Sequence, residues 1–136
     1  MGRNDRIGEK RMRDFVIIGV GAVLGANLRY WVANYFAVRV GLLFPYGTLF
    51  INISGSFLLG FAYTLLANRL VADEGYRLLI GTGFLGAYTT FSTFSYDTVI
   101  LIERGDLLLA GVNSGASLAG SILAAYLGVV LARAIS

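Results

Sequence analysis

The sequence predicts an all-α membrane protein with four transmembrane helices, the third of them broken near its middle. Three observations support this prediction. The chain of 136 residues is 57% hydrophobic and 14% charged, whereas soluble domains carry about 25% charged residues. Four apolar runs, each roughly 20 residues long and therefore able to span a bilayer, are joined by short connections. One of these runs is interrupted by glycines and hydroxyl residues, which weaken a helix.

The composition excludes several kinds of site. The sequence contains no cysteine and no histidine, which rules out disulfides, thiol chemistry, Cys/His metal sites and histidine-dependent triads. We predict that the protein is not an enzyme, because no cluster of nucleophile, base and acid is apparent. The net charge of +3 arises largely in the N-terminal tail and no basic patch continues beyond Arg13, so we expect no nucleic-acid partner.

The chain begins with a polar, basic segment, residues 1–13, which we interpret as a disordered juxtamembrane tail. Residues 14–136 are expected to form one transmembrane channel domain. The first span is predicted over residues 15–38 and contains one cation, Arg29. An ionisable residue inside a span is a functional hypothesis by default. Arg29 also lies near the far end of the span, where a long side chain can instead snorkel to the interface.

The second span is predicted over residues 47–68 and carries no charge. Thr48, Asn52 and Ser56 recur at every fourth position, so they share one helix face. The Asn52 amide at membrane depth is either part of a polar pathway or one half of an interhelical hydrogen bond. Geometry alone leaves both interpretations open.

The fourth span is predicted over residues 107–131 and is also uncharged. Asn113, Ser117 and Ser121 share a face at four-residue spacing, so this span offers a second polar stripe. Two spans contain a G-x-x-x-G spacing, which lets another helix approach closely: Gly21 and Gly25 in the first, and Gly111 and Gly115 in the fourth.

The third span, expected over residues 76–102, is central to the prediction of function. It has glycines at positions 81, 83 and 86, followed by the run Thr-Thr-Phe-Ser-Thr-Phe at residues 89–94. Backbone groups freed by a helix break at membrane depth must be satisfied by protein or by water. We therefore expect a broken helix with freed carbonyls and amides near the midplane. The alternative is a small-residue packing face.

The polar faces favour an anion over a cation. Hydroxyl and amide N–H groups donate hydrogen bonds, and the faces contain no ring of Asp or Glu, the usual device for cation selection. Phe91 and Phe94 are three residues apart and lie on nearly the same helix face. Their positive ring edges are able to contact a small, partly dehydrated anion. The alternative is that both rings simply pack.

The charge distribution gives two answers on orientation. An even number of spans places both termini on one side, and the basic tail predicts that this side is cytoplasmic. Outside the tail, three basic residues on the side of the termini face two or three on the other: Arg69, Arg77 and Arg133 against Arg39 and Arg104, with Arg29 nearby. The core is thus nearly balanced and can insert in both orientations.

Three stretches together resemble the Fluc/CrcB fluoride channels: Gly25 to Tyr30, Gly47 to Gly60 and Gly81 to Phe94. The most specific part is the run Gly-Phe-Leu-Gly followed by Thr-Thr-Phe-Ser-Thr-Phe, and the likeness covers residues 19–132. The resemblance implies a small dual-topology protein that pairs as an antiparallel homodimer in the lipid bilayer. It also implies two pores that pass fluoride passively out of the cell and reject chloride. We expect the cell membrane, in a bacterium the inner membrane, as its location.

Matched by motif position, the resemblance implies roles for single residues. The carbonyls of Gly86 and Thr89 would hold a structural sodium ion between the subunits, and Arg29 would lie near the vestibule. The expected pore-lining residues are Phe91, Phe94, Asn52, Thr48, Ser117, Thr93 and Ser121. The sequence departs from the family pattern at Asn113, where an aromatic or other polar group is expected, and at Ala87, which replaces a frequent glycine. No role is assigned to Asn113 or to Asp97.

Two competing classes remain open. A small four-helix multidrug exporter coupled to protons would need a membrane-embedded carboxylate, and the first span offers only Asp14 at its border. A non-transporting membrane assembly subunit would give no flux with any halide. Transport measurements on the purified protein in liposomes separate both classes from a passive channel.

Overall fold

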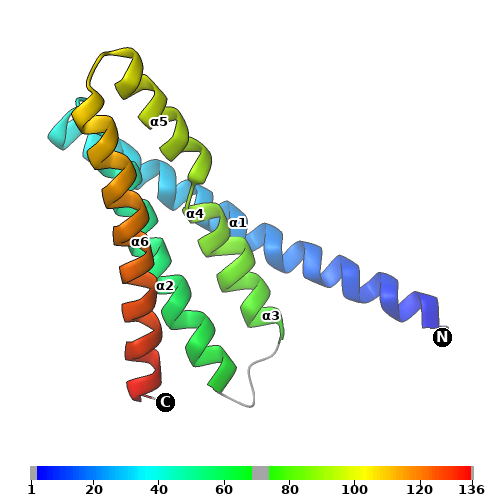
Figure 1. The fold of residues 1–136 in the computed structure, drawn as a ribbon. Coiled ribbons are helices and arrows are strands. Elements are labelled where there is room, and N and C mark those ends of the chain that lie inside the picture. The colour runs from blue at the N-terminus through cyan, green and yellow to red at the C-terminus, as the bar shows by residue number, and fades with distance from the viewer. Residues whose placement is uncertain (1–2, 69–73, 136) are drawn as a thin grey trace.

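The computed structural model describes residues 3–68 and 74–135, and the regular structure of these residues is entirely helical (Figure 1). The elements, in order, are α1 (Arg3–Val40), α2 (Tyr46–Asn68), α3 (Glu74–Tyr76), the π-helix η1 (Arg77–Leu85), α4 (Gly86–Tyr88), α5 (Phe91–Glu103) and α6 (Leu107–Ile135). The prediction of an all-α protein is confirmed.

Three helices in the described part of the chain are long and apolar enough to cross a membrane: Ile7–Val40, Tyr46–Ala67 and Leu107–Ile135. They correspond to the first, second and fourth predicted spans. The segment predicted as the third span is divided among α3, η1, α4 and α5, and none of these elements alone reaches the length of a spanning helix.

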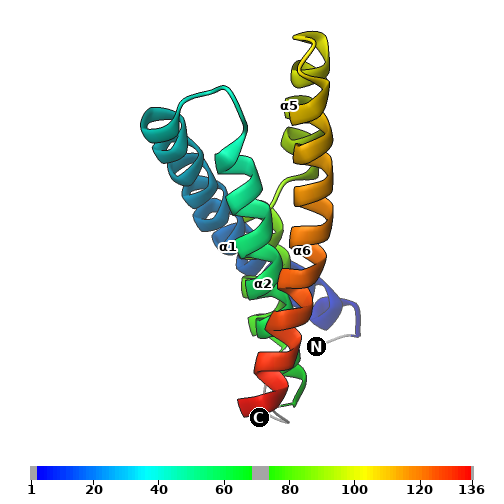
Figure 2. The same ribbon diagram turned by 60° about the vertical axis from the view of Figure 1, so that its left-hand side comes forward.

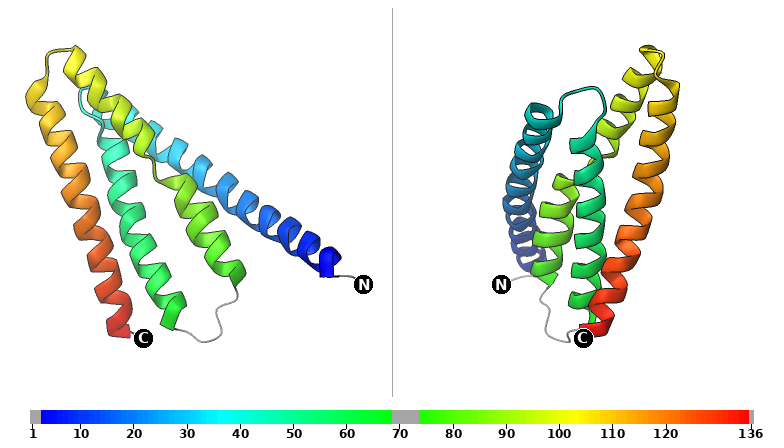
Figure 3. Two further views of the ribbon diagram at one scale, coloured as in Figure 1. Left: turned by 45° about the vertical axis from the view of Figure 1, so that its right-hand side comes forward. Right: turned by 90° about the vertical axis from the view of Figure 1, so that its left-hand side faces the viewer.

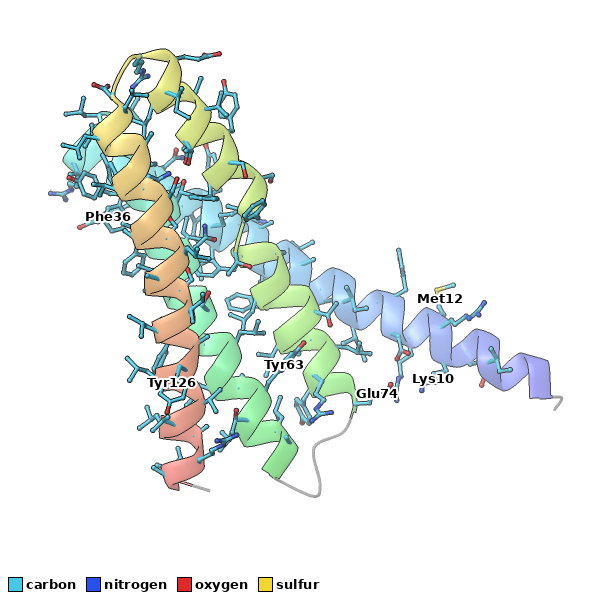
Figure 4. All side chains as sticks on the ribbon, viewed as in Figure 1. Lys10, Met12, Phe36, Tyr63, Glu74 and Tyr126 are labelled. Carbon is cyan, nitrogen blue, oxygen red and sulfur yellow. The ribbon has the colours of Figure 1, made fainter. Side chains whose placement is uncertain are left out.

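The structure differs from the prediction at the N-terminal tail. Residues 1 and 2 lie outside the described residues. From Arg3 onward, the segment expected to be disordered is helical and forms the first part of α1. Glu, Lys, Arg and Met, which fill positions 9–13, are good helix formers. The extension also contacts the start of α3, because Lys10 Nζ lies 2.9 Å from Glu74 Oε2. The two side chains point toward each other in Figure 4.

Two sets of helix contacts form the core of the structure: α2 with α6, and α1 with η1. α2 and α6 lie side by side and run in the same direction (Figures 1 and 2). α1 crosses them at a steep angle and packs against η1. The start of α1 and the end of α6 lie toward the same end of the molecule (Figure 3). The orientation count used Arg69, which lies outside the described residues.

Glycines allow the closest helix contacts. A Cβ atom on Gly21 would overlap the carbonyl oxygen of Leu79, and one on Gly25 would overlap that of Phe84. Because Leu79 and Phe84 are five residues apart, the i→i+5 turn of the π-helix brings both carbonyls to the same face of η1. The first G-x-x-x-G is therefore used inside the chain. Gly60 and Gly128 serve the same purpose between α2 and α6.

The second G-x-x-x-G, Gly111 and Gly115, has no such partner among the described residues. A Cβ atom on Gly111 or Gly115 would meet nothing within 4 Å. Large apolar side chains are also exposed over much of the outer surface, including Phe15, Trp31 and Leu108. Such surface is unfavourable in water and matches the hydrocarbon core of a bilayer or the face of another subunit.

Candidate functional site

The helical path is interrupted between α4 and α5. α4 ends at Tyr88, and Thr89 (φ −77°, ψ 156°) and Thr90 (φ −152°, ψ 116°) are extended before α5 begins at Phe91. The Thr89 amide donates to the Leu85 carbonyl at 3.0 Å and is the last to follow the helical pattern. The two extended residues thus separate two helices that point in nearly the same direction (Figure 1).

Asn52 of α2 bonds to the extended residue through both ends of its side-chain amide. The Thr90 N–H donates to Asn52 Oδ1 at 2.8 Å, and Asn52 Nδ2 donates to the Thr90 carbonyl at 3.0 Å. Thr90 is buried, so these bonds satisfy two backbone groups that no helix supplies with partners. The sequence left two interpretations of Asn52 open, and the interhelical hydrogen bond is present.

The Thr90 side chain caps the start of α5. Its Oγ1 accepts a hydrogen bond from the Thr93 amide at 3.2 Å, as an N-cap threonine does. The same hydroxyl lies 3.0 Å from Thr93 Oγ1 and 3.2 Å from Ser92 Oγ. Because α5 is 13 residues long, its capped first turn carries a partial positive charge and amides suited to an anion.

The break also frees carbonyl groups. In an unbroken helix the Thr90 amide would donate to the Gly86 carbonyl, but here it donates to Asn52. The Thr89 carbonyl likewise loses the Thr93 amide, which donates to the Thr90 hydroxyl. The described residues contain no group of three or more His, Cys, Asp or Glu side chains that could hold a metal ion. Carbonyl oxygens suit a hard cation, so those of Gly86 and Thr89 are candidate ligands.

A groove of about 260 Å³ runs beside the break, between α2, α5 and α6. It contains five of the seven residues that we predicted to line a pore. Its lining residues are Asn52, Ser56, Thr89, Thr90, Phe91, Phe94, Ser117, Leu118, Ser121 and Ile122. The groove thus combines amide and hydroxyl groups with aromatic and aliphatic walls.

Phe91 and Phe94 form an adjacent aromatic pair in this groove. Their ring centroids lie 5.5 Å apart and the rings are tilted by 49°. Phe91 is 79% exposed in the single chain, whereas Phe94 is half-buried. A ring that merely packed within this chain would be covered by it, so the exposure of Phe91 leaves its edge available to another group.

Ser117 contributes an unused hydrogen-bonding group to the same groove. It is 6% exposed, and its Oγ has no hydrogen-bond partner among the described residues. An unpaired buried hydroxyl costs free energy. If the hydroxyl turned toward the groove that Ser117 lines, a ligand or water there would recover that cost.

The two remaining predicted pore residues, Thr48 and Thr93, line a second and larger groove. This groove has a volume of about 470 Å³ and opens between the end of α1, the start of α2 and one side of α5. Thr48 Oγ1 donates to Asp97 Oδ2 at 2.7 Å. The shared face of Thr48 and Asn52 is therefore divided, because one side chain reaches Asp97 and the other reaches Thr90.

Sequence reasoning assigned no role to Asp97, which the structure places in the lining of this larger groove. The available signal was its position four residues after Thr93, which puts both on one face of α5. Asn34 and Arg104 add further polar groups to the groove.

Asn113 and Arg29 line neither groove. Asn113 is fully buried; its Nδ2 donates to Thr98 Oγ1 at 2.9 Å, and its Oδ1 has no partner within the described part of the chain. The amide donor of Asn113 is thus used in a hydrogen bond to α5. Arg29 is half-buried on α1, one turn before the α1 residues that line the larger groove.

Residues 16–129 match the family described as CrcB-like protein, Camphor Resistance (CrcB). The chain belongs to the CrcB family. With three candidate spans in its described residues, this CrcB member is a multi-pass membrane protein.

Several relatives of this CrcB protein carry the name Fluoride-specific ion channel FluC. The one from Methylococcus capsulatus is 47% identical over 116 residues, which are 85% of this chain and 51% of that protein, so the chain spans about half its length. The one from Trichormus variabilis is 44% identical over 124 residues, 90% of each chain. The one from Acidobacterium capsulatum is 44% identical over 121 residues, 89% of this chain and 97% of the relative.

We predict that Asn52→Leu destabilises the protein by about 1–3 kcal/mol, because it leaves the buried Thr90 N–H and carbonyl unpaired. The stability of Asn52→Asp should lie between that of Asn52→Leu and that of the wild type, since aspartate keeps an acceptor for the Thr90 N–H. Thermal denaturation in detergent measures the effect. Asn27→Leu is the matched control, because the exposed Asn27 side chain donates to the Val23 carbonyl of its own helix. Equal stability of Asn52→Leu and Asn27→Leu would contradict the prediction.

Proposed function

We propose that this protein is a passive, fluoride-selective channel that exports cytoplasmic fluoride. The observation that carries the proposal is the groove beside the break, where Asn52, Ser117 and the Phe91–Phe94 pair face one space. The names of the 40–47% identical relatives support fluoride as the ion. No energy source is required, because fluoride enters a cell as the neutral acid, dissociates and then leaves down its gradient.

The groove suits a small anion for two reasons. Hydroxyl groups and the first-turn amides of α5 donate hydrogen bonds that replace part of the hydration shell. The positive edges of the Phe91 and Phe94 rings add weak attraction without a fixed charge. Weak, repeated contacts are what conduction requires, because an ion must be able to leave each site. We assign Thr48 and Thr93 to the mouth of the route, beside the larger groove, and Arg29 to a vestibule position.

We further propose that two copies assemble as an antiparallel homodimer with two pores. The groove lies open at the surface of a single chain, and its polar lining is unfavourable against lipid at membrane depth, so a second copy is expected to cover it. In this proposal η1, α4 and α5 together cross the bilayer as the third, broken span, between α2 and α6. A two-fold axis in the membrane plane requires that the subunits point in opposite directions.

A sodium ion fits the centre of this dimer. The carbonyls of Gly86 and Thr89 have lost their helical donors, and the same pair from a second copy would complete an oxygen cage. When bound, sodium would supply the positive charge that balances these carbonyl dipoles and would join the subunits. The protein's own contribution is to hold the break open, through Asn52 and Thr90.

Liposomes containing the purified protein should release fluoride far faster than chloride, since the smaller fluoride ion approaches the hydrogen-bond donors of the route more closely and is bound more strongly by them. Release is measured with an ion-selective electrode after a potassium ionophore is added. Equal release of the two halides would refute selectivity. A requirement for a proton gradient would refute the channel in favour of coupled transport, and no release of any halide would favour an assembly subunit.

Phe91→Ile and Phe94→Ile should each lower fluoride flux about tenfold, the factor that loss of about 1.4 kcal/mol of ring-edge attraction gives. Isoleucine keeps much of the bulk but has no positive edge. The control is Phe15→Ile, whose ring is 74% exposed on α1 and away from the groove. If both groove variants conduct like the wild type while the oligomer is unchanged, the rings only pack.

A single cysteine should report both orientations in the membrane. The chain has no native cysteine, so Ala134→Cys, at an exposed position near the end of α6, is a unique label site. A membrane-impermeant maleimide should label part of the population from each side, and labelling after detergent addition gives the total. Labelling from one side only would exclude the antiparallel dimer.

A further inference from the structure

α2 contacts the break at three closely spaced positions. Beyond Asn52, which binds Thr90, the Ser54 hydroxyl lies 3.1 Å from the Tyr88 hydroxyl. Gly55 of α2 faces Thr89, the residue between Tyr88 and Thr90. A Cβ atom on Gly55 would overlap Thr89 Cγ2 and would lie 3.0 Å from the Tyr88 ring. One turn of α2 thus contacts Tyr88, Thr89 and Thr90, the last residue of α4 and the two extended residues that follow it.

Tyr88 is held from two sides. It is 4% exposed, and its ring lies parallel to that of Phe84, with an interplanar angle of 2° and centroids 6.2 Å apart. The ring packs in the space beside Gly55, and its hydroxyl reaches Ser54. A buried tyrosine hydroxyl needs such a partner, so rotation of Tyr88 would cost both the ring contacts and the hydrogen bond.

The direction of the hydrogen bonds follows from the proton count. Ser54 Oγ also lies 3.3 Å from the Ile51 carbonyl, which can only accept. A serine hydroxyl has one proton. With that proton on the Ile51 carbonyl, Tyr88 donates to Ser54, and all three groups are satisfied in one chain from α4 to the backbone of α2.

We propose that Ser54 and Tyr88 are positioning residues that set the affinity of the cation site at the break. The proposal rests on the proposed function, in which the carbonyls of Gly86 and Thr89 bind sodium. Tyr88 lies between these two residues, so its orientation determines where both carbonyls point. Gly86 is helical and Thr89 is extended, and Tyr88 is the last helical residue between them. A change in the backbone at Tyr88 would therefore change the angle between the two carbonyl oxygens.

The test measures sodium binding apart from transport. Detergent-solubilised wild type, Tyr88→Phe, Ser54→Ala and the double variant are heated at increasing sodium, with N-methyl-D-glucamine keeping ionic strength constant. We expect sodium to raise the denaturation midpoint of the wild type. In either single variant the sodium concentration for half-maximal stabilisation should rise about fivefold, the factor of one typical hydrogen bond. The double variant should add little, since both changes remove the same bond.

Tyr126→Phe is the matched control, because Tyr126 is 65% exposed on α6 and away from the break. Tyr88→Phe should keep its stability in the absence of sodium, since Ser54 retains the Ile51 carbonyl, so a changed sodium midpoint cannot be a folding defect. Sodium midpoints equal to those of Tyr126→Phe would overturn the positioning role. A wild type that does not respond to sodium would overturn both the cation site and this role, while fluoride release by the same sample would leave the channel proposal standing.

Discussion

The structure depends on the pair of hydrogen bonds between the Asn52 side chain and the Thr90 backbone. A chain cannot leave its helix at membrane depth unless another group satisfies the peptide N–H and carbonyl that it frees. Asn52 supplies a donor and an acceptor at one position, at 3.0 and 2.8 Å from Thr90. Once Thr90 is held in this way, Thr89 remains extended, α5 starts with a capped turn, and the preceding carbonyls have no helical donor.

The packing of α1 against η1 determines where the break lies in the structure. Gly21 and Gly25 let α1 lie against the backbone of η1, and the i→i+5 turn presents the Leu79 and Phe84 carbonyls to these glycines. A π-helix is rare because its hydrogen-bond pattern is normally less favourable, so the close contact with α1 offers a physical reason for its presence here. The register of η1 in turn determines which residues reach the break.

The polar residues serve two spaces instead of one. Asn52 and Ser117 meet the phenylalanine pair beside the break, whereas Thr48 turns to Asp97 in the larger groove. The four-residue spacing of Thr48 and Asn52 predicted a common helix face, and both side chains bond to the later segment that contains Thr90 and Asp97. The spacing could not predict that different neighbours, 49 and 38 residues away, would divide them. The same limitation explains why Asp97 was assigned no role.

The apolar runs and their lengths, the absence of cysteine and histidine, and the glycine and hydroxyl content of residues 81–94 are local properties. They predict the all-helical class and three of the spans. The prediction of five groove residues also depends on the polar stripes of the second and fourth spans, on the spacing of Phe91 and Phe94, and on the family resemblance. The tertiary structure decided the rest. The tail is helical from Arg3 and meets α3 through Lys10, Asn113 is turned toward Thr98, and Tyr88 reaches Ser54. Each of these outcomes depends on a hydrogen bond or ion pair between residues on different helices, and such a partner is chosen by how the helices pack, which periodicity along one helix does not contain.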